Sequence, residues 1–253
     1  MSDQTVEHYE RIAADYDEHW SYDPDHIRRF SQAIVDSLRL TATDAIADVG
    51  CGTGLYTRRL AAEVEPERPI LCVDPVPAML DRLPRSRSLQ PLVASAEDLA
   101  TGRVAAPDRL DAIVLKESFH HVADRRATLE GLAGLLSRHG RILVVMLPRT
   151  IGHPLFREAH ERFEELQPEP AEVVDMVSAV GLRAVVSYRT FHTTIDRERY
   201  VRMLESRYMS VLGEFSDEEL RAGIDQFRHA YRNDPVLRFD DHFAFIKGWV
   251  RPG

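Results

Sequence analysis

The sequence predicts an α/β protein with a doubly wound, mostly parallel sheet of seven strands and an added helical cap. Five short runs rich in Val, Ile and Leu recur within the first 147 residues, and helical patterns separate them. These runs are apolar on both faces, which is typical of parallel strands buried between two helical layers. With 253 residues, 44% of them hydrophobic, the chain can form one large domain with a full core.

The strands and helices of this core are expected in alternation along the chain. The five runs predict strands at 45–50, 69–74, 89–95, 110–117 and 141–147. Helical patterns at 54–63 and 124–137 lie between them. Toward the C-terminus the pattern predicts a helix at 170–180, a strand at 183–194 and a last strand within 240–250.

Additional helices are expected at the beginning of the chain and after the fifth strand. Residues 5–20 predict one aromatic-rich helix, and a second should begin with Asp23 as N-cap and Pro24 in the first turn. The stretch 148–168 is too long for a simple connection and should carry its own helix. Helices are also expected over 196–212 and from Ser216, and we expect the two inserted stretches to pack together above the sheet.

Composition and charge exclude several classes of partner. The net charge of -9 argues against nucleic acid or anionic lipid as a partner. The two cysteines, Cys51 and Cys72, fall in expected core positions and form no disulfide framework. The first residues have neither a basic start nor an apolar stretch, and no run of 18 apolar residues occurs. We therefore expect a cytoplasmic protein with no membrane segment, whose oligomeric state the sequence leaves open.

A glycine-rich segment after the first expected strand indicates a ligand site. Residues 48–54 read Asp-Val-Gly-Cys-Gly-Thr-Gly, and glycines let the backbone turn sharply and let a ligand touch main-chain atoms. A dinucleotide fingerprint needs a third glycine three residues after the second. That position is Leu55 or Thr57, depending on which glycine pair is taken, so the fingerprint fails in both cases.

Two carboxylates narrow the ligand further. Asp48 would repel a pyrophosphate and attract a cationic amino group, whereas Asp74, at the end of the second strand, can accept hydrogen bonds from both ribose hydroxyls. Either residue alone could be a strand-end cap or a turn residue. Together, around a glycine loop, they favour a positively charged adenosyl ligand, and S-adenosylmethionine fits that description.

The segment from about 45 to 147 resembles the class I S-adenosylmethionine-dependent methyltransferases of the small-molecule type, whose fold is Rossmann-like. DVGCGTG matches the family's first motif and VDPVPAML resembles its second. ASAEDL stands where the family often has Gly-Asp-Ala-Glu, LDAIVLKESFHHV resembles its fourth-strand motif, and GRILVV resembles its fifth strand. The N-terminal YERIAADYDEHW resembles a lid segment seen in many members. The resemblance covers the nucleotide-binding half well and the remainder poorly.

This resemblance implies a set of cofactor contacts. Asp48 and the glycines of the loop would hold the methionine end, Asp74 the ribose, and Met79 would pack near the adenine. Ser95 stands at the adenine edge, where the family commonly has an acid. The residues expected to bind the cofactor are Tyr9, Tyr16, Asp48, Gly50, Cys51, Gly52, Gly54, Asp74, Pro75, Met79, Ser95, Ala96, Glu97, Lys116 and Ser118. For the two tyrosines, which could close over the cofactor, plain core packing is the alternative.

The methyl acceptor is expected beyond the carboxyl end of the fourth strand. Methyl transfer is an in-line displacement, so alignment supplies much of the rate, and an acceptor hydroxyl or protonated amine must also lose its proton. A His or Glu can take that proton, which makes His120, His121 and Glu117 candidate catalytic residues. In the family the His pair commonly has a structural role, and for Glu117 an ion pair with Lys116 is the alternative. No Cys/His cluster has zinc-ligand spacing, so no metal site is expected.

We therefore expect three regions with separate roles. Residues 1–40 form an N-terminal helical lid; 41–147, 170–195 and 237–253 form a cofactor-binding α/β core; 148–169 and 196–236 are helical insertions that cover the acceptor. The insertions should supply a mostly apolar acceptor pocket, in which His153 or Arg207 could orient the substrate. The apolar residues expected in it are Phe156, Phe163, Tyr200, Leu204 and Tyr208.

The predicted function is methyl transfer to a small-molecule acceptor, at oxygen or nitrogen rather than carbon. One alternative is a module that binds the cofactor without transferring a methyl group. A nicotinamide-dependent oxidoreductase is the other, disfavoured by the missing third glycine and by Asp48. No motif in the insertions identifies the acceptor.

Overall fold

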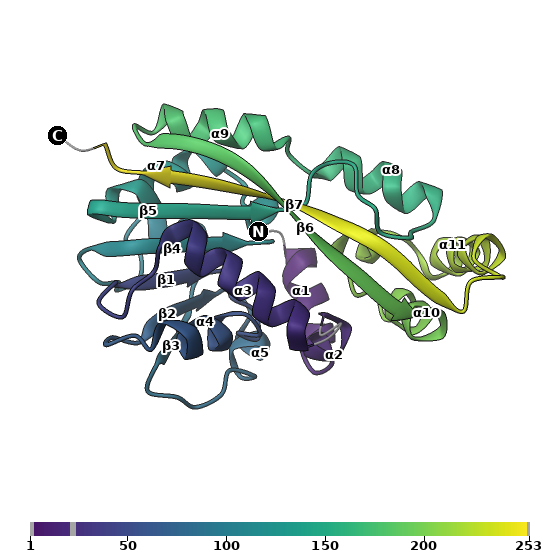
Figure 1. The fold of residues 1–253 in the computed structure, drawn as a ribbon. Helices are drawn as coiled ribbons and strands as arrows, with labels where there is room; N and C mark the ends of the chain where they lie inside the picture. Colours follow the sequence, from purple (N-terminus) through teal and green to yellow (C-terminus); the bar gives the residue numbers. More distant parts are fainter. Residues whose placement is uncertain (1–2, 21–23, 252–253) are drawn as a thin grey trace.

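The computed structural model describes residues 3–20 and 24–251, which form one seven-stranded sheet in the order β3-β2-β1-β4-β5-β7-β6 (Figure 1). The strands are β1 (Ile46–Val49), β2 (Ile70–Asp74), β3 (Leu89–Val93), β4 (Leu110–Lys116), β5 (Leu136–Met146), β6 (Arg183–Asp196) and β7 (Val236–Trp249). Strands β1 to β5 run parallel, and β7 lies antiparallel to both β5 and β6. The predicted fold, a seven-stranded mostly parallel sheet, is confirmed.

Helices cover both faces of this sheet and bury a separate core on each. Alternate residues of the inner strands point to opposite faces, so Ile46 and Val114 lie in one core while Ala47 and Ile113 lie in the other. The first face carries α3 (Pro24–Leu38), α4 (Thr57–Val64) and α5 (Pro77–Leu80), and the second carries α6 (Ala96–Ala100), α7 (Arg125–Gly134) and α9 (Pro170–Ala179). Burial on both faces explains why the strands read as continuous apolar runs.

Strands β6 and β7 extend far beyond the rest of the sheet. They pair over their full length, from Arg183 with Trp249 to Asp196 with Val236, whereas β7 pairs with β5 only from Ala244 onward. The outer half is a two-stranded ribbon that carries α10 (Arg197–Glu205) and α11 (Asp217–Ala230) (Figure 1). Both strands are therefore longer than the sequence predicts.

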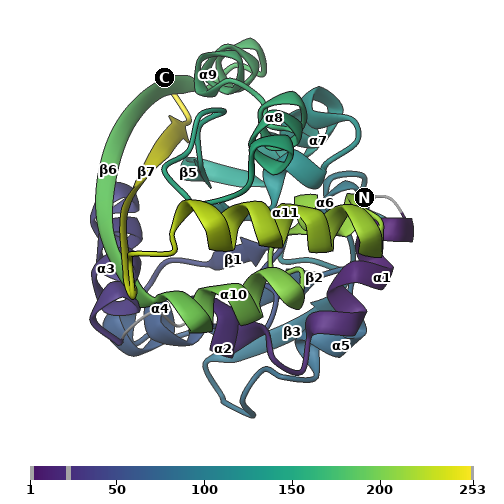
Figure 2. The same cartoon turned by 90° about the vertical axis from the view of Figure 1, so that its right-hand side faces the viewer.

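The inserted helices pack over the carboxyl ends of the parallel strands. Helix α8 (Arg157–Leu166) contacts α11 and the short 3-10 helix η2 (Ser210–Glu214), as expected for the two insertions. Figure 2 shows α10 and α11 lying next to each other on this side of the molecule. The helix predicted over 196–212 ends at Glu205 instead, because Arg207 turns the chain with a φ of 56° before η2 begins.

The helix predicted over residues 5–20 is two helices, α1 (Asp3–Ile12) and α2 (Tyr16–Trp20). The break lets α1 bury Ile12 in a small cluster with Met79, while Trp20 packs with its ring centre 5.2 Å from that of Tyr208. The N-cap predicted at Asp23 lies outside the described residues. In the part of the chain that the structure describes, no helix has the length and apolar content needed to cross a bilayer.

Candidate active site

The glycine loop lies where the strand order reverses, between β1 and β4, at the carboxyl ends of the strands. Gly50, Gly52 and Gly54 have φ values of 77°, 57° and 72°, which L side chains rarely adopt. A Cβ on Gly50 would collide with Cβ of Ser118, so this glycine allows the loop to pack against β4. A Cβ on Gly52 would have Tyr16 as its nearest neighbour, at 4.0 Å, so this glycine leaves open space beside the backbone.

Asp74 fixes the shape of this loop. Its carboxylate accepts hydrogen bonds from the backbone N–H of Gly52 at 2.8 Å and of Val76 at 2.9 Å. Burial raises the pKa of Asp74, and these two backbone donors oppose the shift. Each carboxylate oxygen has a second lone pair, so Asp74 can hold the loop and still accept hydrogen bonds from a ligand.

Asp48 is buried below the loop. Its Oδ2 accepts a hydrogen bond of 2.5 Å from the hydroxyl of Thr57, in the first turn of α4. Burial raises the pKa of Asp48 to about 6, and the Thr57 hydroxyl and the charge of Lys116 oppose that shift. Among the described residues the other carboxylate oxygen has no hydrogen-bond partner.

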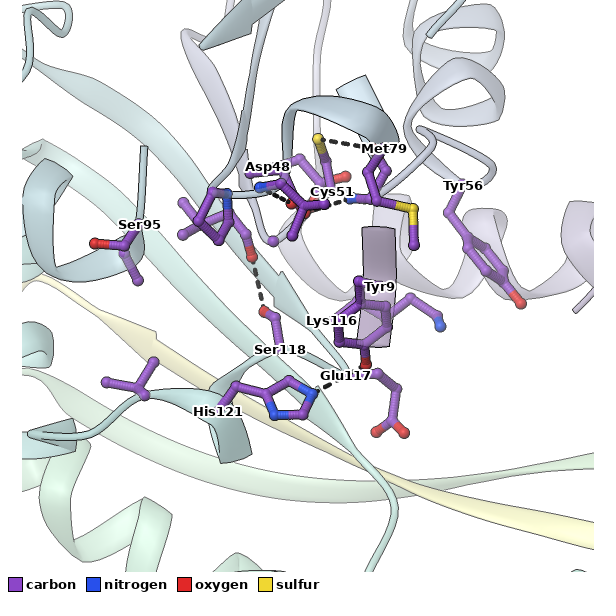
Figure 3. Close-up of a pocket in the computed structure, with 18 of the residues that line it drawn as sticks. Tyr9, Asp48, Cys51, Tyr56, Met79, Ser95, Lys116, Glu117, Ser118 and His121 are labelled. Carbon is purple, nitrogen blue, oxygen red and sulfur yellow. Dashed lines mark hydrogen bonds between the residues drawn. The ribbon is translucent and has the colours of Figure 1, made fainter. Parts of the chain in front are cut away.

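Two adjoining cavities open at this edge of the sheet. The first, of about 90 Å³, lies over the loop, Asp74 and the end of β4 (Figure 3). The second, of about 520 Å³, lies between α1, η1 (Phe119–His121), α8 and η2. Six residues line both cavities and so mark the passage between them: Tyr9, Tyr16, Lys116, Glu117, His121 and Val122.

The structure brings the predicted cofactor residues together. Every one of them except Gly54 lines the first cavity; Gly54 faces Leu83 and turns the loop into α4. The sequence did not single out five further residues of this cavity: Val49, Leu55, Tyr56, Val76 and Val122. Of these, Tyr56 could have been suspected, because an aromatic residue two positions after the last loop glycine must lie close to the site.

At the adenine edge, Ser95 has a structural task. It is the N-cap of α6, where its backbone N–H and its hydroxyl both donate to the carboxylate of Asp98 and its oxygen accepts from the Asp98 N–H. Glu97 follows in the first turn, and its Oε1 accepts from the backbone N–H of Ala123 at 3.1 Å. An acid, Glu97, is therefore present at this edge, two residues after the position where the family commonly has one.

Lys116 and Glu117 lie side by side at the passage without pairing. The Nζ of Lys116 lies 4.1 Å from the ring centre of Tyr56, and Glu117 Oε1 accepts from the backbone N–H of Leu147 at 2.8 Å. No ion pair within 4.0 Å joins the two in the described structure, so the pair weighed from the sequence is not formed. Burial lowers the pKa of Lys116 and raises that of Glu117. Glu117 also has a φ of 52°, which is unusual for a residue with a side chain and is found preferentially at functional sites.

The two histidines occupy different positions at the passage. His121 lines both cavities, and its Nε2 lies 3.0 Å from the hydroxyl of Tyr9 (Figure 3). His120 lines only the second cavity, with its ring centre 4.0 Å from that of His121. Burial lowers the pKa of His120 to about 4 and that of His121 well below its ordinary value. Both rings are therefore neutral near pH 7, and burial makes each of them a weaker base.

Of the five apolar residues predicted for the acceptor pocket, Phe163 and Tyr208 line the second cavity, and the other three do not. All five are buried in the main core. There Tyr200 packs against Phe227 of α11 and Phe239 of β7, contacts that the strand pattern did not predict.

The polar residues expected in that pocket also have structural partners. His153 is buried between Asp241, 2.8 Å from its Nε2, and the hydroxyl of Tyr208, 3.2 Å from its Nδ1. Arg207 donates to the carbonyl oxygens of Leu212 and Phe215 and thereby holds η2. The second cavity instead takes polar side chains from α1 and the region after β4, which the sequence did not indicate: Glu7, His8, Arg11 and Arg125.

Comparison with known proteins agrees with this geometry. Residues 47–142 match the family model described as a methyltransferase domain. An uncharacterized methyltransferase of Mycobacterium tuberculosis is 30% identical over 113 residues, which are 45% of this chain and 55% of that protein. The chain spans about half the length of the curated relatives it matches.

Solved structures share the fold over most of the chain. A protein of Anabaena variabilis, described as a methyltransferase from an antibiotic biosynthesis pathway, superposes with a TM-score of 0.69 at 17% identity, over 87% of this chain and 96% of that one. Phosphoethanolamine N-methyltransferase 2 of Haemonchus contortus, solved with S-adenosyl-L-methionine, gives a TM-score of 0.57 at 16% identity, over 89% of this chain and 53% of that one.

The strand order and the glycine loop are those of the class I S-adenosylmethionine-dependent methyltransferase fold. The resemblance noted in the sequence is therefore confirmed. The match to the methyltransferase-domain model covers residues 47–142, and the Haemonchus contortus structure that shares this fold holds S-adenosyl-L-methionine. The described residues contain no group of three His, Cys, Asp or Glu side chains that could hold a metal ion.

Proposed function

We propose that the protein transfers a methyl group from S-adenosylmethionine to an oxygen or nitrogen atom of a small metabolite. The observation that carries this proposal is the passage between the two cavities. On one side lie the glycine loop, Asp48 and Asp74; on the other lies a cavity of about 520 Å³, a size that suits a small ligand. His121 and Glu117 lie between the two sides.

The first cavity offers a partner for each part of the cofactor. Asp74 can accept hydrogen bonds from the ribose, Asp48 can attract the ammonium group, and Met79 is fully buried where an adenine could pack. The open space at Gly52 lets the ligand approach the backbone. These residues therefore fit the cofactor, which when bound supplies an electrophilic methyl group on a sulfonium.

Tyr9 and Tyr16 line the first cavity and also the second. The 90 Å³ of the first cavity is well below the roughly 300 Å³ at which pockets for small ligands begin. We therefore assign residues 1–40 the role of a lid that moves outward when the cofactor enters. In the same scheme 41–147, 170–195 and 237–253 bind the cofactor, and 148–169 and 196–236 cover the acceptor.

The chain's own residues then have two tasks in the reaction. The passage aligns the acceptor atom with the methyl group, because both ligands must meet where the two cavities join. A base must also take the proton that an acceptor hydroxyl or ammonium loses as the new bond to carbon forms. His121 and Glu117 both line the passage, so either side chain is placed to accept that proton, although burial weakens His121 as a base. His120 lines only the second cavity.

The acceptor cavity favours a small polar molecule. Its wall combines the apolar side chains of Phe163 and Tyr208 with His8, Arg11 and Arg125. The similar Haemonchus enzyme is named for methylation at the nitrogen of a small molecule, which agrees with this choice. The overall charge of -9 provides no attraction for nucleic acid.

The proposal is tested by mass spectrometry of a metabolite extract incubated with the protein and a cofactor that carries a deuterated methyl group. We expect one compound to gain a single labelled methyl, and the same incubation with Asp74→Ala to leave it unlabelled. Binding of S-adenosylhomocysteine without any labelled product would instead indicate a module that only binds the cofactor. Binding of NAD in preference to S-adenosylhomocysteine would indicate an oxidoreductase.

A further inference from the structure

Among the described residues no carboxylate forms an ion pair with the buried amine of Lys116, although Glu117, Asp48 and Asp241 act on its charge from farther away. Lys116 is one of only two lysines in the chain, the other being Lys247. Its Nζ lies over three rings, 4.1 Å from the centre of Tyr56, 5.0 Å from Phe30 and 5.9 Å from Phe243. Aromatic faces stabilise an ammonium group, but they do not neutralise it. Within the described chain no carboxylate lies within 4.0 Å of this amine.

Asp48 lies on the neighbouring strand and faces the same cavity. Strands β1 and β4 are adjacent, and Asp48 is opposite Val114, two residues before Lys116. The two charges act on each other: Lys116 lowers the pKa of Asp48, and Asp48 raises that of Lys116. They are therefore near one another, yet they form no ion pair. One oxygen of Asp48 is held by Thr57, which leaves the other for a ligand.

The amine of Lys116 lies on the cofactor side of the passage. Tyr56, the ring closest to it, lines the first cavity and not the second. Figure 3 shows the Lys116 amine extending toward Tyr56, while the carboxylate of Glu117 extends in another direction, where Leu147 holds it. A ligand in the first cavity is therefore better placed to meet this amine than an acceptor in the second.

We propose that Lys116 and Asp48 form a two-point clamp for the amino-acid end of the cofactor, in which Lys116 binds the carboxylate and Asp48 binds the ammonium. This inference rests on the proposed function. An amino-acid group is a zwitterion whose ammonium and carboxylate are bonded to the same carbon, and the cavity presents two opposite charges that form no ion pair with each other. Binding then provides each buried charge with a partner, which removes the cost of leaving it unpaired.

The test compares two ligands that differ only in this group. S-adenosylhomocysteine has the amino-acid end, whereas 5′-methylthioadenosine keeps the adenine, the ribose and the thioether but lacks it. Lys116→Met keeps an apolar chain over the rings and removes the charge. By calorimetry we expect Lys116→Met to weaken S-adenosylhomocysteine by roughly 10- to 100-fold, as for the loss of a hydrogen bond between charged groups, and to leave 5′-methylthioadenosine within about twofold.

Three further variants complete the experiment. Asp48→Asn should show the same selective loss, and Lys116→Arg should restore part of the preference for S-adenosylhomocysteine. Lys247→Met is the matched control, because Lys247 lies over Trp249 on β7 and lines neither cavity. It should bind both ligands as the wild type does. Melting curves of each variant establish that it is folded.

Several outcomes would overturn the clamp. Unchanged binding of S-adenosylhomocysteine by folded Lys116→Met would show that the amine does not contact it, and an equal loss of both ligands would show that Lys116 only supports the cavity. Failure of the proposed function looks different: the wild type would then bind neither ligand, or it would bind S-adenosylhomocysteine but give no product in the labelled-methyl assay. If the wild type binds both ligands and Lys116→Met binds them equally well, the clamp is refuted but the cofactor site is not.

Discussion

Gly52 and Gly50 have similar backbone conformations but different surroundings, and this difference predicts opposite consequences of substitution. An alanine at either position must adopt a positive φ, 57° or 77°, which costs roughly 1–2 kcal/mol in the folded state. For Gly52→Ala this is the whole cost to the fold, because the nearest atom to the new Cβ is 4.0 Å away. For a chain of this length we expect the melting temperature to fall by about 2–8 °C.

The same methyl group should obstruct the cofactor. It would occupy the space through which the ligand approaches the loop, and overpacking by one methyl group costs about 1–3 kcal/mol. We therefore expect Gly52→Ala to weaken S-adenosylhomocysteine by roughly 5- to 150-fold, and Gly52→Val to abolish binding while helix content stays close to that of the wild type. Calorimetry and circular dichroism measure the two effects separately.

Gly50→Ala is the comparison. Its Cβ would collide with Cβ of Ser118, which is anchored to the backbone at the end of β4, so the loop and the strand must separate. We expect a larger loss of stability than for Gly52→Ala. The reasoning would be refuted if Gly52→Ala bound S-adenosylhomocysteine as tightly as the wild type, or if both variants lost stability equally.

Four other predictions follow from the site. Asp74→Ala should weaken S-adenosylhomocysteine and 5′-methylthioadenosine alike, by roughly 2–4 kcal/mol in calorimetry, whereas unchanged affinity in a folded variant would mean that the ribose site is misplaced. Burial raises the pKa of Asp48 from 3.8 to about 6, so its stabilising contribution is complete below pH 4 and is lost as pH rises through 6. Asp48→Asn should therefore be more stable than the wild type at pH 8, by roughly 1–3 kcal/mol in the free energy of unfolding, but not at pH 4, and an equal difference at both pH values would contradict this. His121→Phe should lower turnover by about 100-fold or more in the labelled-methyl assay with little change in S-adenosylhomocysteine affinity, and the reverse pattern would make it a cofactor residue. Phe163→Ala should raise the acceptor KM because Phe163 lines the second cavity, whereas Phe156→Ala should leave it unchanged; both side chains are buried in the main core, so both variants should lose about 3–5 kcal/mol of stability by denaturant unfolding, and an equal KM for both would contradict this.

The sheet and the cofactor side could be predicted because their signals are local. A strand buried on both faces is apolar at every position, as Ile70–Asp74 is, and a loop with three positive φ values needs glycine at each. The proximity of Asp48 and Asp74 could be predicted for a similar reason, because the ends of adjacent parallel strands meet at one edge of the sheet. For this reason fourteen of the fifteen residues expected to bind the cofactor line one cavity.

The acceptor side could not be predicted, because it depends on contacts between distant segments. The helical stripe of Tyr200 and Leu204 correctly indicates burial, but it does not say that Phe227 and the β6–β7 ribbon will cover it. The polar wall of the second cavity comes from His8 and Arg11, two hundred residues away from η2. No periodicity within either segment indicates that they meet.

The length of the β6–β7 ribbon determines how far α10 and α11 lie from the sheet, and this distance can change only by whole residues. A strand advances about 3.3 Å per residue and alternates its faces, so lengthening both strands by one residue would turn the outward faces of the ribbon inward. Lengthening both by two residues would preserve the faces and move α10 and α11 outward by about 7 Å. Chains that share this sheet can therefore change how far α10 and α11 extend by even-numbered insertions in the outer ribbon, within 236–243 of β7 and 189–196 of β6, without altering the half that binds the cofactor. The ribbon thus acts as a spacer of adjustable length between two parts that can evolve separately.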